Sequence, residues 1–287
     1  MSTRSTPVGA GEPLPPYRAL LAVDTERFSR NPSARLPGLS ALLPEVLQQA
    51  MSACDLDEIW RRRRFAQATG DGYVLGTESE YAPFLLDPFL DSLQDELERQ
   101  DRSLRSEDRR LRLRLRVSVH LGPVPDSGDE LRDRVSTPTN ETFRLLDAAP
   151  TRRALTSSNP DITLMAAIVS QRVFEDVVLA GYTGLHQDRF EPVTAELRNK
   201  DFARPAWLYV PRPSRRPPGT DGDGSVGADG ERGSAAPAGS PGPGRGTVVA
   251  PVFNGQVGSS VVSDQVNGGV NPRFDRDSFG ARGADRE

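Results

Sequence analysis

LRLRLRVSVHL, at residues 111–121, is the segment with the most regular pattern in this chain. Apolar and polar side chains alternate along it without a break, so successive side chains point to opposite sides of the backbone. This period of two predicts a β-strand with one apolar and one polar face. The polar face could line a polyanion groove, but we expect a solvated face, and it carries Arg112, Arg114, Arg116, Ser118 and His120.

Shorter patterns on both sides predict the other elements. An apolar run at 18–23 predicts a strand that ends at Asp24, followed by a loop over 25–37. Two runs around Gly70-Asp71-Gly72 predict a hairpin with Asp71 at its tip. Helical leucine spacing predicts amphipathic helices around 43–51 and 90–97. The remaining expected elements are a helix at 140–149, a strand at 162–169, a helix from Ser170 to Gly181 and a hairpin formed by 190–197 and 206–210.

The order of these elements is strand, helix, hairpin, helix, strand, helix, strand, helix, hairpin. Strands mixed with helices in this order predict an α/β sandwich, an α+β arrangement with one mixed sheet. The folded domain is expected over residues 17–212, which is long enough to bury a sizeable core.

Outside this domain the composition changes. Of the 287 residues, 26 are Gly and 25 are Pro, and many of them lie in the last quarter of the chain. Such segments do not repay their ordering entropy. We therefore expect a disordered N-terminus at 1–16, a disordered linker at 213–246, a strand-forming segment at 247–271 and a disordered end at 272–287.

Composition also excludes several functions. A single cysteine, Cys54, excludes an intramolecular disulfide, and two histidines exclude a Cys/His-rich zinc site, so any metal must be held by oxygen atoms. A net charge of -4 argues against general nucleic-acid binding. Without a run of 18 apolar residues or an apolar leader, a membrane span and ordinary secretion are not expected, which favours the cytoplasm.

Four short segments lie in a recognisable order on these elements. They are AVDTERFS at 22–29, TGDGY at 69–73, LRVSVHLGPV at 115–124 and NETFRLL at 140–146. Together they resemble the class III nucleotide cyclase family, the adenylate and guanylate cyclase homology domain, over residues 17–211. This resemblance implies a ferredoxin-like cyclase fold with one mixed, mainly antiparallel sheet.

The resemblance also implies roles for the acids near the start of the domain. Asp24 and Asp71 would hold two Mg²⁺ or Mn²⁺ ions, with the backbone carbonyl of Thr25 as a further ligand. Two such ions can serve the attacking and the leaving oxygens when a ribose 3′-hydroxyl displaces pyrophosphate. The turn with Phe28 would lie near the β- and γ-phosphates. The implied activity is that of a phosphorus–oxygen lyase that makes a 3′,5′-cyclic nucleotide second messenger.

The later segments supply the other implied groups. Asn140 and Arg144 are four residues apart and share one helix face. They match the ribose-orienting Asn and the transition-state Arg of the family, and Lys200 lies where the family often has a triphosphate-binding lysine. In this family the acids and the Asn/Arg pair come from different subunits, so the resemblance implies a homodimer.

Base recognition is where the sequence departs from the family. The purine-selecting positions correspond to Gln67 and Asp133, whereas adenylate cyclases usually have Lys with Asp, and guanylate cyclases Glu with Cys. A glycine that usually precedes the Asn is absent, and STPT stands at 136–139. An amide both donates and accepts hydrogen bonds. ATP, GTP and pyrimidine triphosphates therefore all remain possible substrates.

Two main hypotheses follow. The first is an active cyclase. The second is a catalytically weak or inactive nucleotide-binding sensor or scaffold of the same fold in a bacterial signalling or immunity system. The intact Asp24, Asp71, Asn140 and Arg144 favour the enzyme, and Gln67 with the altered approach to Asn140 favours the sensor. A third, weaker hypothesis makes the tail the main function.

The tail supports two interpretations. Residues 253–270 resemble short amyloid-like signalling motifs of bacterial immunity proteins, because they combine β-propensity, a single charge and no proline. Such a motif would pair with a partner that carries a similar motif. The alternative is a disordered tail.

Truncation at Arg245 tests the tail. If the tail stacks as cross-β, the full-length protein forms thioflavin-positive fibres and the truncated protein does not, because the segment with strand propensity is gone. Equal thioflavin signals from both proteins would contradict the amyloid-like interpretation.

Overall fold

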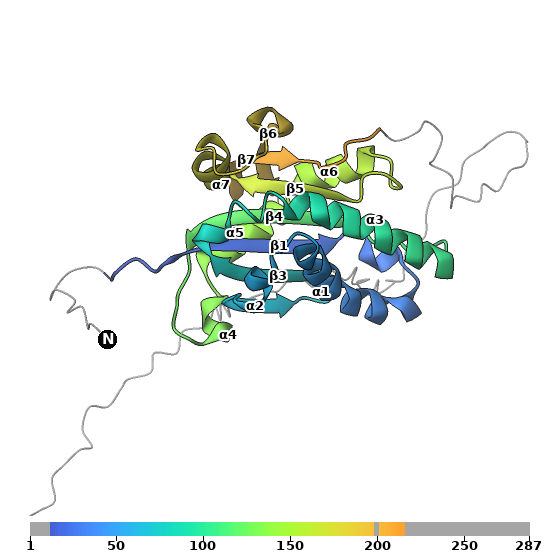
Figure 1. Ribbon diagram of the computed structural model, residues 1–287, viewed down its shortest axis with the longest axis horizontal. Helices are drawn as coiled ribbons and strands as arrows, with labels where there is room; N and C mark the ends of the chain where they lie inside the picture. The colour runs from blue at the N-terminus through green and yellow to red at the C-terminus, as the bar shows by residue number, and fades with distance from the viewer. Residues whose placement is uncertain (1–11, 198–200, 216–287) are drawn as a thin grey trace, which may run out of the picture. The chain divides into compact units, whose positions relative to one another are not determined.

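The computed structural model describes residues 12–197 and 201–215 (Figure 1). Its frame is a seven-stranded sheet with the order β2-β3-β1-β4-β5-β7-β6. Only β4 and β5 pair in parallel, so the sheet is mixed and mainly antiparallel, as the sequence predicts. The strands are β1 (Tyr17–Thr25), β2 (Phe65–Ala68), β3 (Gly72–Glu78), β4 (Leu115–Pro123), β5 (Met165–Ser170), β6 (Phe190–Leu197) and β7 (Phe202–Tyr209).

Helices cover both faces of this sheet (Figure 1). One face is packed by α1 (Leu36–Ser52), α3 (Phe89–Glu107) and the π-helical turn η4 (Phe174–Leu179). The other face is packed by α5 (Thr137–Leu146) and α6 (Ala149–Ser157). The shorter helices are η1 (Phe28–Arg30), η2 (Ser33–Arg35), α2 (Asp57–Arg61), η3 (Ser79–Tyr81), α4 (Glu130–Asp133), α7 (Gln171–Val173) and η5 (Gln187–Arg189).

Strand β1 contains a continuous run of apolar residues because both of its faces are covered. Leu21 and Val23 belong to the core beneath α1 and α3, whereas Leu20 and Ala22 belong to the core beneath α5. A strand buried on both sides has no polar alternation. Asp24 continues the α5 side of this alternation, so its carboxylate projects toward the face that carries α5.

The strand predicted at 111–121 begins later than expected, at Leu115. Leu111 and Leu113 are buried, but the backbone around them lies outside the sheet. The reason is that β1 ends opposite Leu115 and β5 begins there, so residues 111–114 have no neighbouring strand to pair with.

The expected solvation of the arginines on this strand is wrong for Arg114 and Arg116. Arg114 is 7% exposed, and the Arg116 side chain is 13% exposed. Helix α5 packs against β4 on this face, and Ser118 donates a hydrogen bond to the backbone carbonyl of Thr142 in that helix. Period-two alternation alone does not distinguish a solvated polar face from one that a helix covers.

The helix predicted at 140–149 is two helices. Helix α5 begins at Thr137, capped by the Ser136 hydroxyl, which accepts a hydrogen bond from the amide of Thr139. It ends at Leu146, and α6, which the sequence analysis missed, starts at Ala149. Pro150 explains the break, because proline fits the first turn of a helix but cannot continue a preceding one.

Both hairpins, the two amphipathic helices and the Ser170 helix cap are confirmed, but the helix after Ser170 continues as the π-helical turn η4, β5 begins at Met165, and the loop expected over 25–37 contains η1, η2 and the start of α1. Residues 1–11 and 216–287 lie outside the described residues. The second range contains most of the predicted linker and the whole amyloid-like segment, so both of these remain predictions. None of the helices in the described part of the chain is long and apolar enough to cross a membrane.

A buried histidine gives the fold a pH dependence. His120 is 6% exposed, and its Nδ1 has no hydrogen-bond partner. Burial and the neighbouring charge of Arg172 lower the pKa of His120 to about 4. Glu141, whose Oε2 lies 3.8 Å from Nε2, is too far away for a hydrogen bond to the ring.

We expect His120 to lower the free energy of unfolding as the pH drops from 7 to 5, against an opposite contribution from Asp24, whose pKa is raised to about 6. The unfolded chain protonates His120 near pH 6.5, whereas the folded protein resists protonation down to about pH 4. This difference costs about 2 kcal/mol at pH 5. Urea unfolding at both pH values measures it. His120→Gln should remove this contribution, and replacement of the exposed His186 should not.

Candidate active site

Pairing between β1 and β3 brings the two predicted metal-binding acids together. Asp24 lies opposite Gly72 in the register, and the amide of Thr25 donates to the carbonyl of Asp71 at 2.8 Å. A Cβ atom at Gly72 would lie 2.6 Å from the carbonyl oxygen of Val23, so this close approach requires glycine. The side chain of Asp24 is largely buried and that of Asp71 is exposed. The pairing therefore brings the backbones of the two residues together, and a shared metal site for their carboxylates remains a prediction.

Asp24 is already engaged by a cation of the same chain. Arg116 of β4 donates from Nε to Oδ1 at 2.7 Å and from Nη2 to Oδ2. Burial raises the pKa of Asp24 to about 6, although the charge and hydrogen bonds of Arg116 oppose this shift. A third nitrogen of Arg116, Nη1, lies 3.6 Å from Oδ1 of Asp147, the residue that follows α5. Arg116 therefore lies between two carboxylates.

A second buried arginine anchors the segment after Asp24. Arg114 forms an ion pair with Glu26 at 2.6 Å, and both side chains are less than a tenth exposed. Its other nitrogens donate to the hydroxyl of Ser158 and to the backbone carbonyls of Leu155 and Thr163, at 2.8, 2.9 and 3.0 Å. The backbone of Glu26 is held as well, because its amide donates to the carbonyl of Arg114. This anchor joins the start of the loop to α6 and to the segment before β5.

The far end of the same loop is held by Asn31. Its Oδ1 accepts from the amide of Arg112 at 2.9 Å, and its Nδ2 donates to the carbonyl of Phe28 at 3.2 Å. Arg27 adopts a left-handed conformation with φ of 53°, which few non-glycine residues tolerate. The half-buried Phe28 thus lies in a loop that is fixed at both ends before any ligand binds.

Asn140 and Arg144 are exposed on α5, on the side of the sheet toward which Asp24 projects. The Arg144 guanidinium lies over the ring of Phe202, 5.6 Å from its centre. Among the described residues, no ion pair joins Arg144 to Asp24 or Asp71. One chain therefore brings the acids together and presents the Asn/Arg pair, but it does not join the two sets.

The predicted nucleotide-binding residues Gln67 and Asp133 lie on β2 and α4, two elements that contact each other. Gln67, opposite Val74 in the outer strand β2, lines a cavity of about 330 Å³ together with Arg61, Arg63 and Tyr73. Because Gln67 and Val74 share a face, the amide lies on the same side of the sheet as Asp24. Neutral and cationic hydrogen-bond donors therefore border this hollow.

Asp133 has a local structural role. Its carboxylate accepts hydrogen bonds from the Ser127 amide at 2.9 Å and the Ser127 hydroxyl at 2.7 Å. Although burial pushes its pKa upward, these hydrogen bonds and one from the Gly128 amide hold the pKa of Asp133 below its ordinary value. The residue therefore closes the loop before α5, and base recognition by Asp133 remains a prediction. Lys200 lies outside the described residues.

The donor atoms near Asp24 suit a hard divalent cation. Among the described residues, no group of three or more His, Cys, Asp or Glu side chains is placed to hold a metal ion. Two carboxylates and the carbonyl of Thr25 remain, all of them oxygen donors. Mg²⁺ is commonly held by one or two carboxylates, with water and substrate phosphates as its other ligands. The residues therefore fit a metal that binds together with a triphosphate, provided that Asp24 exchanges its arginine partner.

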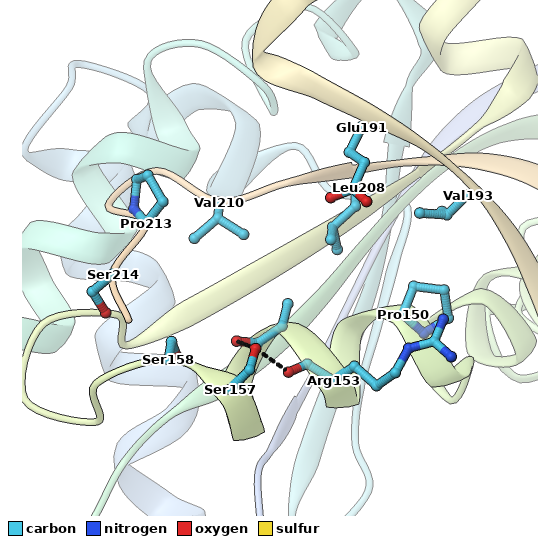
Figure 2. Close-up of a pocket in the computed structure, with 11 residues that line it drawn as sticks. Pro150, Arg153, Ser157, Ser158, Glu191, Val193, Leu208, Val210, Pro213 and Ser214 are labelled. Atoms are coloured by element: carbon cyan, nitrogen blue, oxygen red, sulfur yellow. Dashed lines mark hydrogen bonds between the residues drawn. The ribbon is translucent and has the colours of Figure 1, made fainter. Parts of the chain in front are cut away.

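A further hollow lies away from these residues. Figure 2 shows a cavity of about 270 Å³ between α6, the final hairpin and the segment after β7. Its lining contains both apolar and polar side chains, and Arg153 and Glu191 lie on opposite sides of it. None of the predicted site residues lines it, so the candidate site is not this cavity.

Sequence reasoning missed the charged partners of the site. Arg116, Asp147 and the Arg114–Glu26 pair were not identified as site residues. A signal was present for Arg116, because antiparallel pairing of the two apolar strands places it opposite Asp24. No local pattern pointed to Asp147, whose position depends on where α5 ends.

No protein-family model matches the sequence, and no curated protein matches it significantly. Solved structures with a similar fold include the guanylyl cyclase Cya2, with a TM-score of 0.44 and 16% identity over 71% of this chain and 95% of that one. The adenylyl cyclase CyaB from P. aeruginosa gives 0.45 and 13% over 70% and 95%. Adenylate cyclases from Trypanosoma brucei give 0.45 and 16% over 75% and 95%. Identities this low leave the chemistry to be derived from the chain's own residues.

Replacing Arg114 should destabilise the protein strongly. Arg114→Met removes the close partner of the buried Glu26 and leaves it the longer contact with Arg27, 3.8 Å from Nε to Oε1, which costs about 3–5 kcal/mol of unfolding free energy. The double variant with Glu26→Leu should regain much of this loss, because no unpaired charge remains. Urea unfolding measures both variants.

Arg112→Met is the matched control. The Arg112 side chain is 33% exposed and lies 3.8 Å from Asp161, so its loss should cost less than about 1 kcal/mol. Equal losses for both arginines, or no recovery in the double variant, would contradict the anchoring role of the buried pair.

Proposed function

We propose that this protein is a class III nucleotide cyclase, which converts a nucleoside triphosphate into a 3′,5′-cyclic nucleotide and pyrophosphate. One observation carries the proposal. Asp24, near the end of β1, and Asp71, in the turn between β2 and β3, are brought together beside a pre-formed loop, and the same side of the sheet carries α5 with exposed Asn140 and Arg144. These are the residue types that phosphoryl transfer needs, in the order in which the resembling family has them.

In the proposed reaction the ribose 3′-oxygen attacks the α-phosphorus. The bond from that phosphorus to the β-phosphate oxygen breaks, and pyrophosphate leaves. Two bound divalent ions would stabilise charge on the attacking and leaving oxygens. Asp24, Asp71 and the carbonyl of Thr25 would hold them, and the loop through Phe28 would position the β- and γ-phosphates.

In this proposal the side chains on α5 contact the ribose and the phosphoryl group that is transferred. Asn140 would orient the ribose by hydrogen bonds, and Arg144 would donate to the charge that develops on the transferring phosphoryl group. Because one chain does not join Arg144 to the acids, the proposed active form is a homodimer in which each site combines Asp24 and Asp71 of one subunit with Asn140 and Arg144 of the other.

The base that the site prefers remains open. Gln67 both donates and accepts hydrogen bonds, and the hollow beside it is also lined by Arg61 and Arg63. Arginine donors suit carbonyl oxygens of a base, and an amide suits either carbonyl or amino groups.

A second candidate function is a nucleotide sensor of the same fold that does not cyclise its ligand. The ion pair between Asp24 and Arg116 favours it, because a carboxylate bound to arginine on both oxygens is not free to hold a metal ion. Gln67 in place of the usual base-selecting residues also favours it.

Incubation with each of the four ribonucleoside triphosphates and Mn²⁺ separates the two functions. We expect mass spectrometry to detect one or more cyclic nucleotides from the wild-type protein. Asp71→Asn should abolish the product while the fold, followed by circular dichroism, is retained, because Asp71 is exposed. Tight binding of a triphosphate without cyclisation would instead support the sensor.

Mixing two inactive variants tests the shared site. Asp71→Asn and Arg144→Ala should each be inactive alone, but an equal mixture should recover about a quarter of the wild-type activity. Random pairing makes half of the dimers mixed, and each mixed dimer has one intact site of two. A mixture that stays inactive while the subunits exchange would contradict the assignment of these residues to opposite subunits.

A further inference from the structure

Arg116 is held between one buried and one exposed carboxylate. It binds both oxygens of Asp24, whose side chain is 13% exposed, and its remaining nitrogen lies 3.6 Å from Asp147, whose side chain is 40% exposed. The stronger contact is therefore with the buried acid, and a second acid stands within reach.

This arrangement conflicts with metal binding at Asp24. A Mg²⁺ ion sits about 2.0–2.1 Å from its oxygen ligands. Both oxygens of Asp24 already accept hydrogen bonds from the guanidinium, so an ion at that distance would lie close to a second cation. Partly buried charges are only weakly screened by salt. The ion and Arg116 therefore cannot share Asp24 in its present geometry.

Asp147 resolves the conflict. We propose that Arg116 is a positioning residue that neutralises Asp24 in the metal-free protein and moves to Asp147 when a divalent ion takes its place; this inference rests on the function proposed above. The exchange leaves neither the buried carboxylate nor the arginine without a partner, and an unpaired buried charge is what such a site must avoid.

The exchange links the metal site to α5. Asp147 immediately follows the helix, and Arg144 lies one turn before it. Metal binding would therefore shorten the ion pair at the end of the helix that carries the transition-state arginine. The Asp147 carboxylate is needed as the main partner of Arg116 only when a metal ion is bound.

Mn²⁺ affinity of the full-length protein tests this exchange without any activity measurement. Electron paramagnetic resonance reports the free Mn²⁺ concentration during a titration. The proteins compared are wild type, Asp71→Asn, Arg116→Gln, Asp147→Asn and the double variant with Arg116→Gln and Asp147→Asn. Asp126→Asn is the matched control, because Asp126 is similarly exposed, at 42%, and pairs with Arg18 instead of Arg116.

We expect Asp147→Asn to weaken Mn²⁺ binding roughly tenfold, because Arg116 then has no second partner. In the Arg116→Gln background the same change should have less than about a twofold effect. Asp126→Asn should bind Mn²⁺ like the wild type. If Asp147→Asn weakens Mn²⁺ binding equally in the wild type and in Arg116→Gln, the exchange is wrong. The Asp147 carboxylate would then act directly on the charge of the metal ion, without Arg116.

The control at Asp71 separates this inference from the proposed function. If Mn²⁺ fails to bind, or binds equally well to Asp71→Asn, the metal site itself is wrong and the exchange falls with it. If Asp71→Asn loses Mn²⁺ binding, but Asp147→Asn has the same effect in the wild type and in Arg116→Gln, only the exchange is wrong.

A second measurement covers the case in which Arg116→Gln does not fold. In ¹⁵N-labelled wild-type protein, the Nε–H resonance of Arg116 can be assigned by its loss in Arg116→Lys. We expect saturating Mg²⁺ to shift this resonance in the wild type but not in Asp71→Asn. A resonance that stays in place while Mg²⁺ binds would overturn the exchange.

Discussion

The pairing of β1 with β3 on one side and β4 on the other is the constraint on which the candidate site depends. Both ladders are antiparallel and reach Asp24 at the end of β1. One ladder brings the turn of Asp71 to this point, and the other brings Arg116. A shift of either register by one residue would turn every side chain to the other face. It would therefore separate the charges and break the apolar core at the same time.

Two buried ion pairs follow from this register. Asp24 pairs with Arg116, and two residues further along Glu26 pairs with Arg114. Buried pairs of this kind add little net stability over apolar residues, but loss of one partner is costly. Their effect here is to specify position, because they hold the loop after β1 against β4 and α6. A binding loop that is ordered before its ligand arrives loses less entropy on binding.

The two pairs differ in how completely they are enclosed. Arg114 donates to three further oxygen acceptors, so its position is fixed by the fold. Among the residues that the structure describes, Arg116 has one alternative acidic partner, Asp147, whose side chain is 40% exposed. This difference separates a structural anchor from a group that can exchange partners, although both arginines come from the same stretch of alternating sequence.

Local periodicity and turn chemistry were enough to predict the strands, most of the helices, the hairpin with Asp71 at its tip and the apolar run that ends at Asp24. They also placed Asn140 and Arg144 on one helix face. That the polar side of β4 is covered depends on long-range packing, because its burial requires α5 and α6 to lie on it. The partners of Arg114 and Arg116 also depend on the tertiary structure. They lie up to 92 residues away in the chain, and no local pattern encodes contacts of that separation.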